Sequence, residues 1–176
     1  MFLNSSNKYF PFNFARFISI RPANIRDQQF VTESIRELVK VGENLDKMPR
    51  IEGIEQTYEK MIEDTKHYAI YIAEDQNQKI GAAVLSIHDA LHIGGKYAYL
   101  EEFVISSSAR GTGVGSKFLK WIEKEAQQKG LVAISLCQPP TTSQYNEERS
   151  RFYEKNGYLD QSISRVKFFK PWFKVD

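Results

Sequence analysis

Cysteine is almost absent from this sequence: Cys137 is the single cysteine among 176 residues. One thiol cannot form a disulfide within the chain, so the core rather than covalent cross-links must hold the fold together. This composition fits a reducing, cytoplasmic environment. Cys137 ends an apolar run. Because apolar surroundings raise the pKa of a thiol and make it less reactive, we expect Cys137 to be a small buried apolar residue rather than a nucleophile.

Long apolar runs are missing as well. No stretch approaches the ~20 residues that a membrane-spanning helix needs. The aromatic side chains of residues 1–14 are interrupted by asparagine and proline and lack the basic start of a signal peptide. We therefore expect neither a leader peptide nor a membrane partner.

An excess of charge of one sign is also absent. The 24 basic and 22 acidic residues leave a net charge of +2, and their even spread argues against a nucleic-acid partner. Apolar residues make up 41% of the chain, enough for one core. We expect residues 17–176 to form one domain after an N-terminal extension, 1–16, and the oligomeric state stays open, with a homodimer among the options.

Helical and extended patterns in the first half predict an α/β fold. Apolar residues at helical spacing predict one helix after Asp27, a candidate N-cap, that ends at Gly42, and another over 54–62. A weak strand over 17–20, closed by Pro22, precedes them. Three β-rich runs then predict an antiparallel meander over residues 68–73, 80–87 and 97–105.

In the second half, apolar residues four apart from Val114 onward predict a helix that stops at Gly130. The apolar run 131–137 predicts a central strand covered on both faces. Asn146 is a candidate cap for a last helix, before final strands over residues 158–160 and 165–169. The predicted fold is a single α/β domain with a mixed, mostly antiparallel central sheet and helices on both faces.

The glycine-rich segment from Arg110 to Ser116 reads Arg-Gly-Thr-Gly-Val-Gly-Ser and opens the predicted helix. The first N–H groups of a helix lack intrahelical partners, and glycines let a phosphate approach them without a Cβ in the way. Ser116 replaces the third glycine of the dinucleotide fingerprint, and Ser116-Lys117 reverses the Lys-Ser order of a P-loop. A pyrophosphate cradle with Arg110 beside it remains, and a turn without a ligand is the alternative.

Two motifs together resemble the GNAT superfamily of acyl-CoA-dependent N-acetyltransferases. The first is Leu100-Glu101-Glu102-Phe103-Val104-Ile105, followed after four residues by Arg110-Gly111-Thr112-Gly113-Val114-Gly115. The second runs from Asn146 to Tyr158 and reads Asn-Glu-Glu-Arg-Ser-Arg-Phe-Tyr-Glu-Lys-Asn-Gly-Tyr. The resemblance extends more loosely over residues 18–169. It implies a GNAT-like sheet, acetyl-CoA as co-substrate, no metal ion, and direct transfer of acetyl to a primary amine in one ternary complex.

The resemblance also implies roles for individual residues. The strand at Phe103 and Ile105 would pair with the pantetheine arm, and Tyr153 would protonate the departing CoA thiolate, with a plain core tyrosine as the alternative. The implied cofactor-binding residues are Phe103, Val104, Ile105, Arg110, Gly111, Thr112, Gly113, Val114, Gly115, Ser116, Asn146 and Tyr153.

The reaction needs a proton acceptor, because an amine near neutral pH is mostly protonated. Glu101 and Glu102 are the candidates, and since adjacent strand residues point to opposite faces, at most one should face the cleft. The resemblance places the base at Glu101, nine residues before Arg110, and makes Glu102 a supporting carboxylate. Ordinary charges at a strand edge are the alternative.

His88 and His92 suggest a zinc-binding helix, but the acid between them is an aspartate and their segment is too short for a helix. We expect a loop at the rim of the substrate cleft and no metal site.

The acceptor amine is left open. Residues 99–102 resemble polyamine acetyltransferases, whereas 109–111 and 114–117 resemble aminoalkylphosphonate acetyltransferases, and the two substrate classes differ in charge. Residues 43–64, expected beside the acceptor, carry seven acidic and three basic side chains, which favours a cationic small-molecule amine. Protein or peptide acetylation and a non-catalytic acyl-CoA-binding regulatory module are the alternatives.

Overall fold

A five-stranded sheet with the order β1-β2-β3-β4-β5 forms the centre of the described chain. The structure is a computed structural model that describes residues 18–138, 145–160, 165, 167 and 173–175. The strands are β1 (Ser19–Pro22), β2 (Tyr68–Asp75), β3 (Gln78–Ala90), β4 (Gly95–Ile105) and β5 (Ile134–Leu136). The first four pair antiparallel and β5 joins β4 in parallel, which confirms the predicted mixed, mostly antiparallel sheet.

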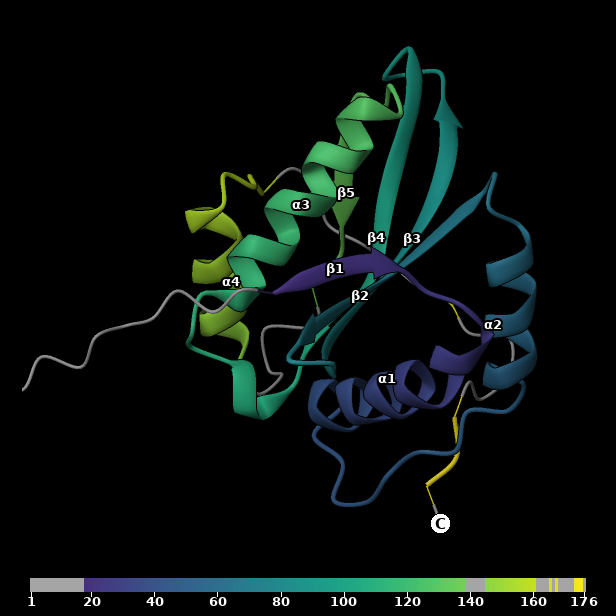
Figure 1. The fold of residues 1–176 in the computed structure, drawn as a ribbon, viewed down its shortest axis with the longest axis vertical. Coiled ribbons are helices and arrows are strands. Elements are labelled where there is room, and N and C mark those ends of the chain that lie inside the picture. The colour runs from purple at the N-terminus through teal and green to yellow at the C-terminus, as the bar shows by residue number, and fades with distance from the viewer. Residues whose placement is uncertain (1–17, 139–144, 161–164, 166, 168–172, 176) are drawn as a thin grey trace, which may run out of the picture.

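Helices cover both faces of this sheet, as predicted. Figure 1 shows α1 and α2 on one side and α3 and α4 on the other. The helices are α1 (Gln28–Gly42), α2 (Ile54–Glu63), α3 (Val114–Gln128) and α4 (Asn146–Lys155), with short 3-10 turns at Ile25–Asp27 and Ser107–Ala109. In the described chain, no helix has the length and apolar character needed to cross a membrane.

Two separate cores result from the alternation of side chains along the strands. Ile70 and Ile72 of β2 pack with α1 and α2, whereas Tyr71 and Ala73 pack toward α3. The α1–α2 core contains the buried residues Val31, Tyr58, Ile70, Ile72, Ala82, Val84 and Val104. Because both faces are covered, β2 and β3 are nearly continuous apolar runs rather than alternating ones.

The start of the domain differs from the prediction in two details. The first strand ends at Pro22, as predicted, but Pro22 belongs to the strand and pairs with Tyr71; β1 is an outer strand of the described sheet, where proline is tolerated. Asp27 occupies the N-cap position of α1, as predicted, but its side chain makes no capping hydrogen bond. Its carboxylate is 1% exposed and accepts hydrogen bonds from Arg21 at 2.7 Å and from the Asn24 N–H at 2.9 Å.

The segment with two histidines is not a loop. β3 extends to Ala90, so His88 is a strand residue paired with Tyr97, and only residues 91–94 turn. The sequence changes from apolar to polar after Ile87, which predicts that the strand ends there. The change marks only the edge of the core, because β3 continues beyond it and stays paired with β4.

The prediction for residues 131–137 is wrong. β5 has three residues, pairs with β4 alone among the described strands, and leaves Ser135 and Cys137 exposed. Hydrophobic composition suggested a covered strand, but Val132 is 57% exposed. Cys137 is therefore not a buried hydrophobe.

The predicted end of the fold is also corrected. Asn146 does not cap α4 but begins it, after Tyr145 in the left-handed region at φ 62°. Residues 158–160 form no strand. The N-terminal extension, 1–16, and most of 165–169 lie outside the described residues.

Candidate active site

The site is built around β4. Its neighbour β3 pairs with the whole strand, whereas its other neighbour, β5, pairs with only a short part of it. β3 pairs with β4 from Gly95 to Ile105, whereas β5 pairs with it only from Ala98 to Leu100. From Glu101 to Ile105, the edge of β4 that faces away from β3 has no strand partner in the described chain. The sheet therefore opens between β4 and β5.

Main-chain groups point into this opening at alternate residues. The N–H of Ser106 donates to Ile80 of β3 at 2.9 Å. Since successive strand residues direct their N–H and C=O groups to opposite sides, those of Phe103 and Ile105 point to the open edge. The Ile105 carbonyl accepts a hydrogen bond from Nε of Arg110 at 2.9 Å.

A β-bulge at Glu101 decides where the two candidate carboxylates lie. Leu85 pairs with Leu100 and Val84 pairs with Glu102, so Glu101 is the extra residue. Glu102 thus shares a face with Val84 of the α1–α2 core. Glu101 accepts a hydrogen bond from Oγ of Ser86, on the same face, at 2.5 Å.

This arrangement corrects the prediction that the two glutamates point to opposite faces. Regular alternation would have separated them, but the bulge inserts one residue and puts both side chains on the α1–α2 face of the sheet. Sequence pattern does not reveal the bulge, because Glu101 and Glu102 sit in an otherwise uninterrupted β-rich run.

The two carboxylates differ in environment. Glu101 is exposed, whereas Glu102 is half-buried. Burial raises the pKa of Glu102 from 4.5 to about 7, and the neighbouring charge of Glu101 adds to this effect. The raised pKa brings Glu102 into the range suited to acid–base catalysis near neutral pH.

Beyond the α1–α2 core, the same sheet face becomes polar and aromatic. Oγ of Ser86 lies 2.7 Å from Nε2 of His88, whose ring is 5.6 Å from that of Tyr97. Burial raises the pKa of Tyr99 to about 12, with contributions from Cys137 and Glu101. Sequence reasoning missed Ser86 and Tyr97. The signal for both was strand alternation: Ser86 lies two residues before His88 on β3, and Tyr97 lies two residues before Tyr99 on β4. Side chains two residues apart share one face of a sheet.

Tyr153 projects from α4 into a tight group of rings. Its ring is 5.1 Å from that of Phe152 and 5.6 Å from that of Tyr158. Burial raises the pKa of Tyr153 to about 12, while the charge of Arg149 lowers it and that of Glu102 raises it. The phenol therefore keeps its proton at neutral pH and is near enough to Glu102 to feel its charge.

The glycine-rich segment adopts the geometry of an open cradle. Gly111 and Gly113 have φ values of 73° and 83°, and a Cβ on either would meet nothing within 4 Å. Gly113 immediately precedes α3, so the first N–H groups of that helix, which lack intrahelical partners, follow directly on this open segment. Thr112 braces the turn by donating to the Ala109 carbonyl at 2.7 Å.

Gly115 has a different role from the other two glycines. A Cβ there would lie 3.2 Å from Cε2 of Phe152, so the glycine allows α3 and α4 to approach. The Phe103 ring stacks on Phe152 at 5.9 Å, and Val114 is fully buried. The side chains of Phe103 and Val114 therefore belong to the core, and only their main-chain groups are left to contact a ligand. Asn146 is half-buried in the first turn of α4.

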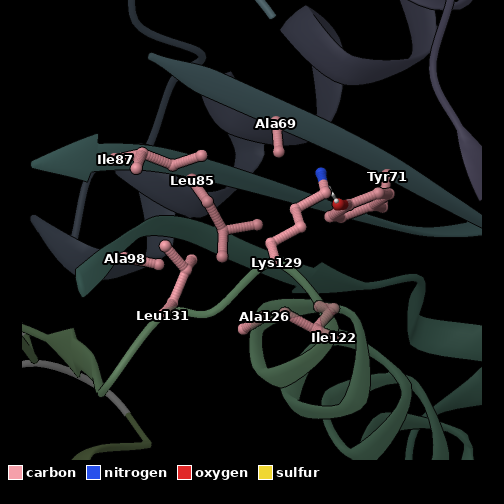
Figure 2. A pocket seen from close by; sticks show the side chains of 9 residues that line it. All are labelled: Ala69, Tyr71, Leu85, Ile87, Ala98, Ile122, Ala126, Lys129 and Leu131. Carbon is pink, nitrogen blue, oxygen red and sulfur yellow. Dashed lines mark hydrogen bonds between the residues drawn. The ribbon is translucent and has the colours of Figure 1, made fainter. Parts of the chain in front are cut away.

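A small apolar cavity lies away from this site. Figure 2 shows it between the sheet and the C-terminal half of α3, with Lys129 donating to the Tyr71 hydroxyl at 3.0 Å. It opens on the α3 face, whereas Glu101 and Ser86 lie on the other face. It is therefore separate from the carboxylates. Its lining consists of Ala69, Tyr71, Leu85, Ile87, Ala98, Ile122, Ala126, Lys129 and Leu131.

A second hollow lies near the expected acceptor side, between α1 and the start of α2. It is lined by Arg36, Arg50, Ile51, Glu52, Gly53, Glu55 and Gln56. Arg36 and Glu55 form an ion pair across it at 2.5 Å. Among the described residues, no group of three or more His, Cys, Asp or Glu side chains is arranged to hold a metal ion.

Comparison with known proteins assigns this arrangement to a family. Residues 33–158 match the model of the acetyltransferase (GNAT) family. The chain therefore belongs to the GNAT family and is an acetyl-CoA-dependent N-acetyltransferase.

Individual relatives are distant. The chain is 27% identical over 139 residues to the aminoalkylphosphonate N-acetyltransferase of Salmonella typhimurium strain LT2, covering 79% of this chain and 83% of that protein. It also resembles a transcriptional regulator from Bacillus halodurans C-125 (TM-score 0.72, 21% identity, 87% of this chain and 100% of that one). Glucosamine-6-phosphate N-acetyltransferase from Arabidopsis thaliana has a TM-score of 0.62 at 20% identity, with 88% and 99% covered. The structural matches show the fold alone.

Proposed function

We propose that this enzyme transfers acetyl from acetyl-CoA to the primary amine of a small molecule by direct attack in a ternary complex. The observation that carries the proposal is the bulge at Glu101. It places two carboxylates, one of them with a pKa near neutrality, beside the open edge of β4. An N-acetyltransferase needs a proton acceptor next to the thioester, and this edge offers main-chain groups to hold the thioester arm.

Acetyl-CoA would lie along the open edge and end at the cradle. The main chain of Phe103 and Ile105 would pair with the amides of pantetheine, and Val104 keeps this edge straight by pairing with β3. The N–H groups from Gly111 to Ser116 would hold the pyrophosphate at the start of α3, with the Arg110 guanidinium as counter-charge. Asn146 remains a cofactor contact proposed from the family resemblance.

The chemistry requires one proton to be removed and one to be supplied. Glu101, exposed on the acceptor side, takes the proton from the ammonium group, and the amine attacks the thioester carbonyl. As the carbon–sulfur bond breaks, Tyr153 donates its phenolic proton to the thiolate of CoA. A proton held by Glu102, whose charge already acts on Tyr153, can replace the one that the phenol has lost.

The acceptor we favour is a cationic amine. Glu101 and Glu102 concentrate negative charge, and the rings of Tyr97 and Tyr99 share their sheet face; carboxylates and aromatic faces both attract ammonium groups. A second candidate class is aminophosphonates, because the Salmonella relative carries that substrate in its name and Arg36 and Arg50 line the hollow beside α2.

A thiol-release assay separates these acceptors. We expect 1,4-diaminobutane and spermidine to release CoA faster than 2-aminoethylphosphonate, an aminoglycoside or a peptide at equal concentration. Faster turnover of 2-aminoethylphosphonate would reverse the charge assignment in favour of the second candidate. Turnover of peptides alone would contradict the small-molecule proposal.

A further inference from the structure

Ser86 connects Glu101 to a histidine that the reaction described above does not use. The Ser86 hydroxyl donates to Oε1 of Glu101 at 2.5 Å and lies 2.7 Å from Nε2 of His88. Ser86 is 3% exposed, whereas His88 reaches solvent. The three groups thus form one chain of hydrogen bonds from the carboxylate at the open edge of β4, through the sheet surface, to water.

We propose that Ser86 and His88 are positioning residues that orient Glu101 and carry its proton away during turnover. The inference rests on the proposed role of Glu101 as proton acceptor. An acceptor amine must sit against the exposed side of Glu101 to react, so the bound substrate covers that side. Ser86 and His88 lie on the other side and leave a second exit.

The proton transfer balances at each group. As the N–H bond of the ammonium breaks, an O–H bond forms on Glu101. The transfer starts from the Nδ1–H tautomer of His88, whose Nε2 is free to accept: the carboxyl donates its proton to Oγ of Ser86, the Ser86 hydroxyl proton moves to Nε2, and the imidazolium releases its Nδ1 proton to water. Ser86 then again donates to the ionised Glu101, as the structure shows, while Nε2–H donates to Ser86. Proton exchange with water returns His88 to the Nδ1–H tautomer before the next turnover.

Other ionisable groups face this chain and set its electrostatics. They are Tyr68 of β2, which pairs with Ser86; Tyr97, Tyr99 and Glu102 of β4; and Cys137 after β5. Burial raises the pKa of Tyr99 to about 12 and that of Glu102 to about 7, and among these neighbours His88 is the side chain in hydrogen-bond contact with Ser86 on the side away from Glu101.

The first test measures turnover of Ser86→Ala and His88→Gln, with His92→Gln as the matched control in the adjacent turn. With 1,4-diaminobutane, or 2-aminoethylphosphonate if the diamine is not accepted, kcat should fall at least about tenfold in both relay variants. Acetyl-CoA affinity should not change. The double variant should be no slower than the slower single one, because both act through one chain. Added imidazole should restore His88→Gln. A His88→Gln enzyme as fast as His92→Gln would overturn the proposal.

The same experiment separates this proposal from the proposed function. If Glu101→Gln keeps full activity, Glu101 is not the proton acceptor and the function proposed above is wrong at that step. If Glu101→Gln is slow while Ser86→Ala and His88→Gln are as fast as wild type, only the relay is wrong.

A second test needs no acceptor. The imidazole nitrogen signals of His88, assigned by their loss in His88→Gln, should show a hydrogen bond at Nε2 in wild type, because Nε2 lies 2.7 Å from Oγ of Ser86. Ser86→Ala should remove that hydrogen bond. The signals of His92 should stay where they are. Unchanged His88 signals in Ser86→Ala would overturn the relay.

Discussion

Glu101 and Glu102 lie side by side on one face of the sheet, because the β-bulge opposite Leu85 and Val84 cancels the alternation between them. Two adjacent carboxylates disfavour each other's ionisation, and the more buried of the two bears the effect. The pKa of Glu102 is raised to about 7, by burial first and by Glu101 second. The ionisation of Glu102 therefore affects both the free energy of unfolding and the proton transfer proposed for the site.

Replacing Glu102 by glutamine should stabilise the protein above neutral pH. The pKa of Glu102 is about 7 in the fold against 4.5 ordinarily, so between these values the folded state binds more protons than the unfolded state. The free energy of unfolding of the wild type therefore falls as pH rises from about 4 to 8, by at most about 3 kcal/mol. Glu102→Gln has no ionisable group at this position and should not show this loss. Urea unfolding at pH 5 and pH 8 measures the effect.

Glu101→Gln is the control for this prediction, since Glu101 is exposed and its variant keeps the size of the side chain. The gain of Glu102→Gln over wild type should grow between pH 5 and pH 8, while that of Glu101→Gln should stay smaller at both. A gain for Glu102→Gln that is independent of pH would mean that packing, not ionisation, is responsible.

Removing the phenolic proton of Tyr153 should slow turnover while leaving acetyl-CoA binding intact. Tyr153→Phe keeps the ring that contacts Phe152 and Tyr158, and general acid assistance is worth roughly 100- to 10,000-fold. Because burial raises the pKa of Tyr153 to about 12, the wild type should show no loss of proton donation below pH 10. Steady-state kcat and calorimetric acetyl-CoA affinity check both statements.

Tyr158→Phe provides the comparison, as its ring lies 5.6 Å from Tyr153 in the same cluster. It should turn over at close to the wild-type rate. Similar losses in the two variants would indicate disturbed packing of α4 rather than a missing proton donor.

The buried carboxylate of Asp27 should be a major contributor to stability. Burial alone would raise its pKa, but hydrogen bonds from Arg21 and Lys79 outweigh this and hold the pKa of Asp27 well below its ordinary 3.8. Asp27→Asn leaves Lys79 without its ion pair and Arg21 with Glu74 as its remaining charge partner, and should cost about 3 kcal/mol near pH 7. Urea unfolding against pH measures it.

The pH dependence of that loss has a defined sign. A carboxylate with a depressed pKa stabilises the fold above its ordinary value and loses this contribution as pH falls below about 4. The difference between wild type and Asp27→Asn should therefore shrink below pH 4. Asp64→Asn, which removes an exposed pair with His67, should cost much less than Asp27→Asn, because solvent screens an exposed pair. Equal costs for the two variants would contradict the role of burial.

Periodic features of this fold could be predicted from the sequence. The apolar stripe of α3 and its stop at Gly130, which has a φ of 73°, follow from helical spacing and from the freedom of glycine. The meander of β2, β3 and β4 follows from three β-rich runs separated by turn residues. These elements carry the glycine-rich segment and the two glutamates, and the roles of these residues stay a prediction.

Features that depend on a single residue's pairing could not be predicted. The bulge at Glu101 depends on the register between β3 and β4, which no local pattern encodes. The relay partner Ser86 lies 15 residues from Glu101 and meets it only through that register. The exposure after β5 could not be predicted either, because its apolar residues are typical of a covered strand, whereas tertiary context leaves Cys137 exposed. Tyr145 takes the left-handed position before α4, which residue type does not announce.

Substituting Gly113 should abolish the rise in melting temperature that acetyl-CoA causes. Substituting Gly94 should destabilise the protein to a similar extent but keep that rise. Gly113 and Gly94 both have left-handed φ values, 83° and 71°, and a Cβ on either would meet nothing within 4 Å. Valine at each position should therefore lower the melting temperature through backbone strain of about 1 to 3 kcal/mol. Only Gly113 adjoins the first N–H groups of α3, where a side chain would stand in the path of the pyrophosphate. Acetyl-CoA at 100 times its Kd should stabilise wild type and Gly94→Val by about 2.7 kcal/mol, seen as a rise in melting temperature, and should leave Gly113→Val unmoved; an equal rise in all three proteins would exclude the cradle as the pyrophosphate site.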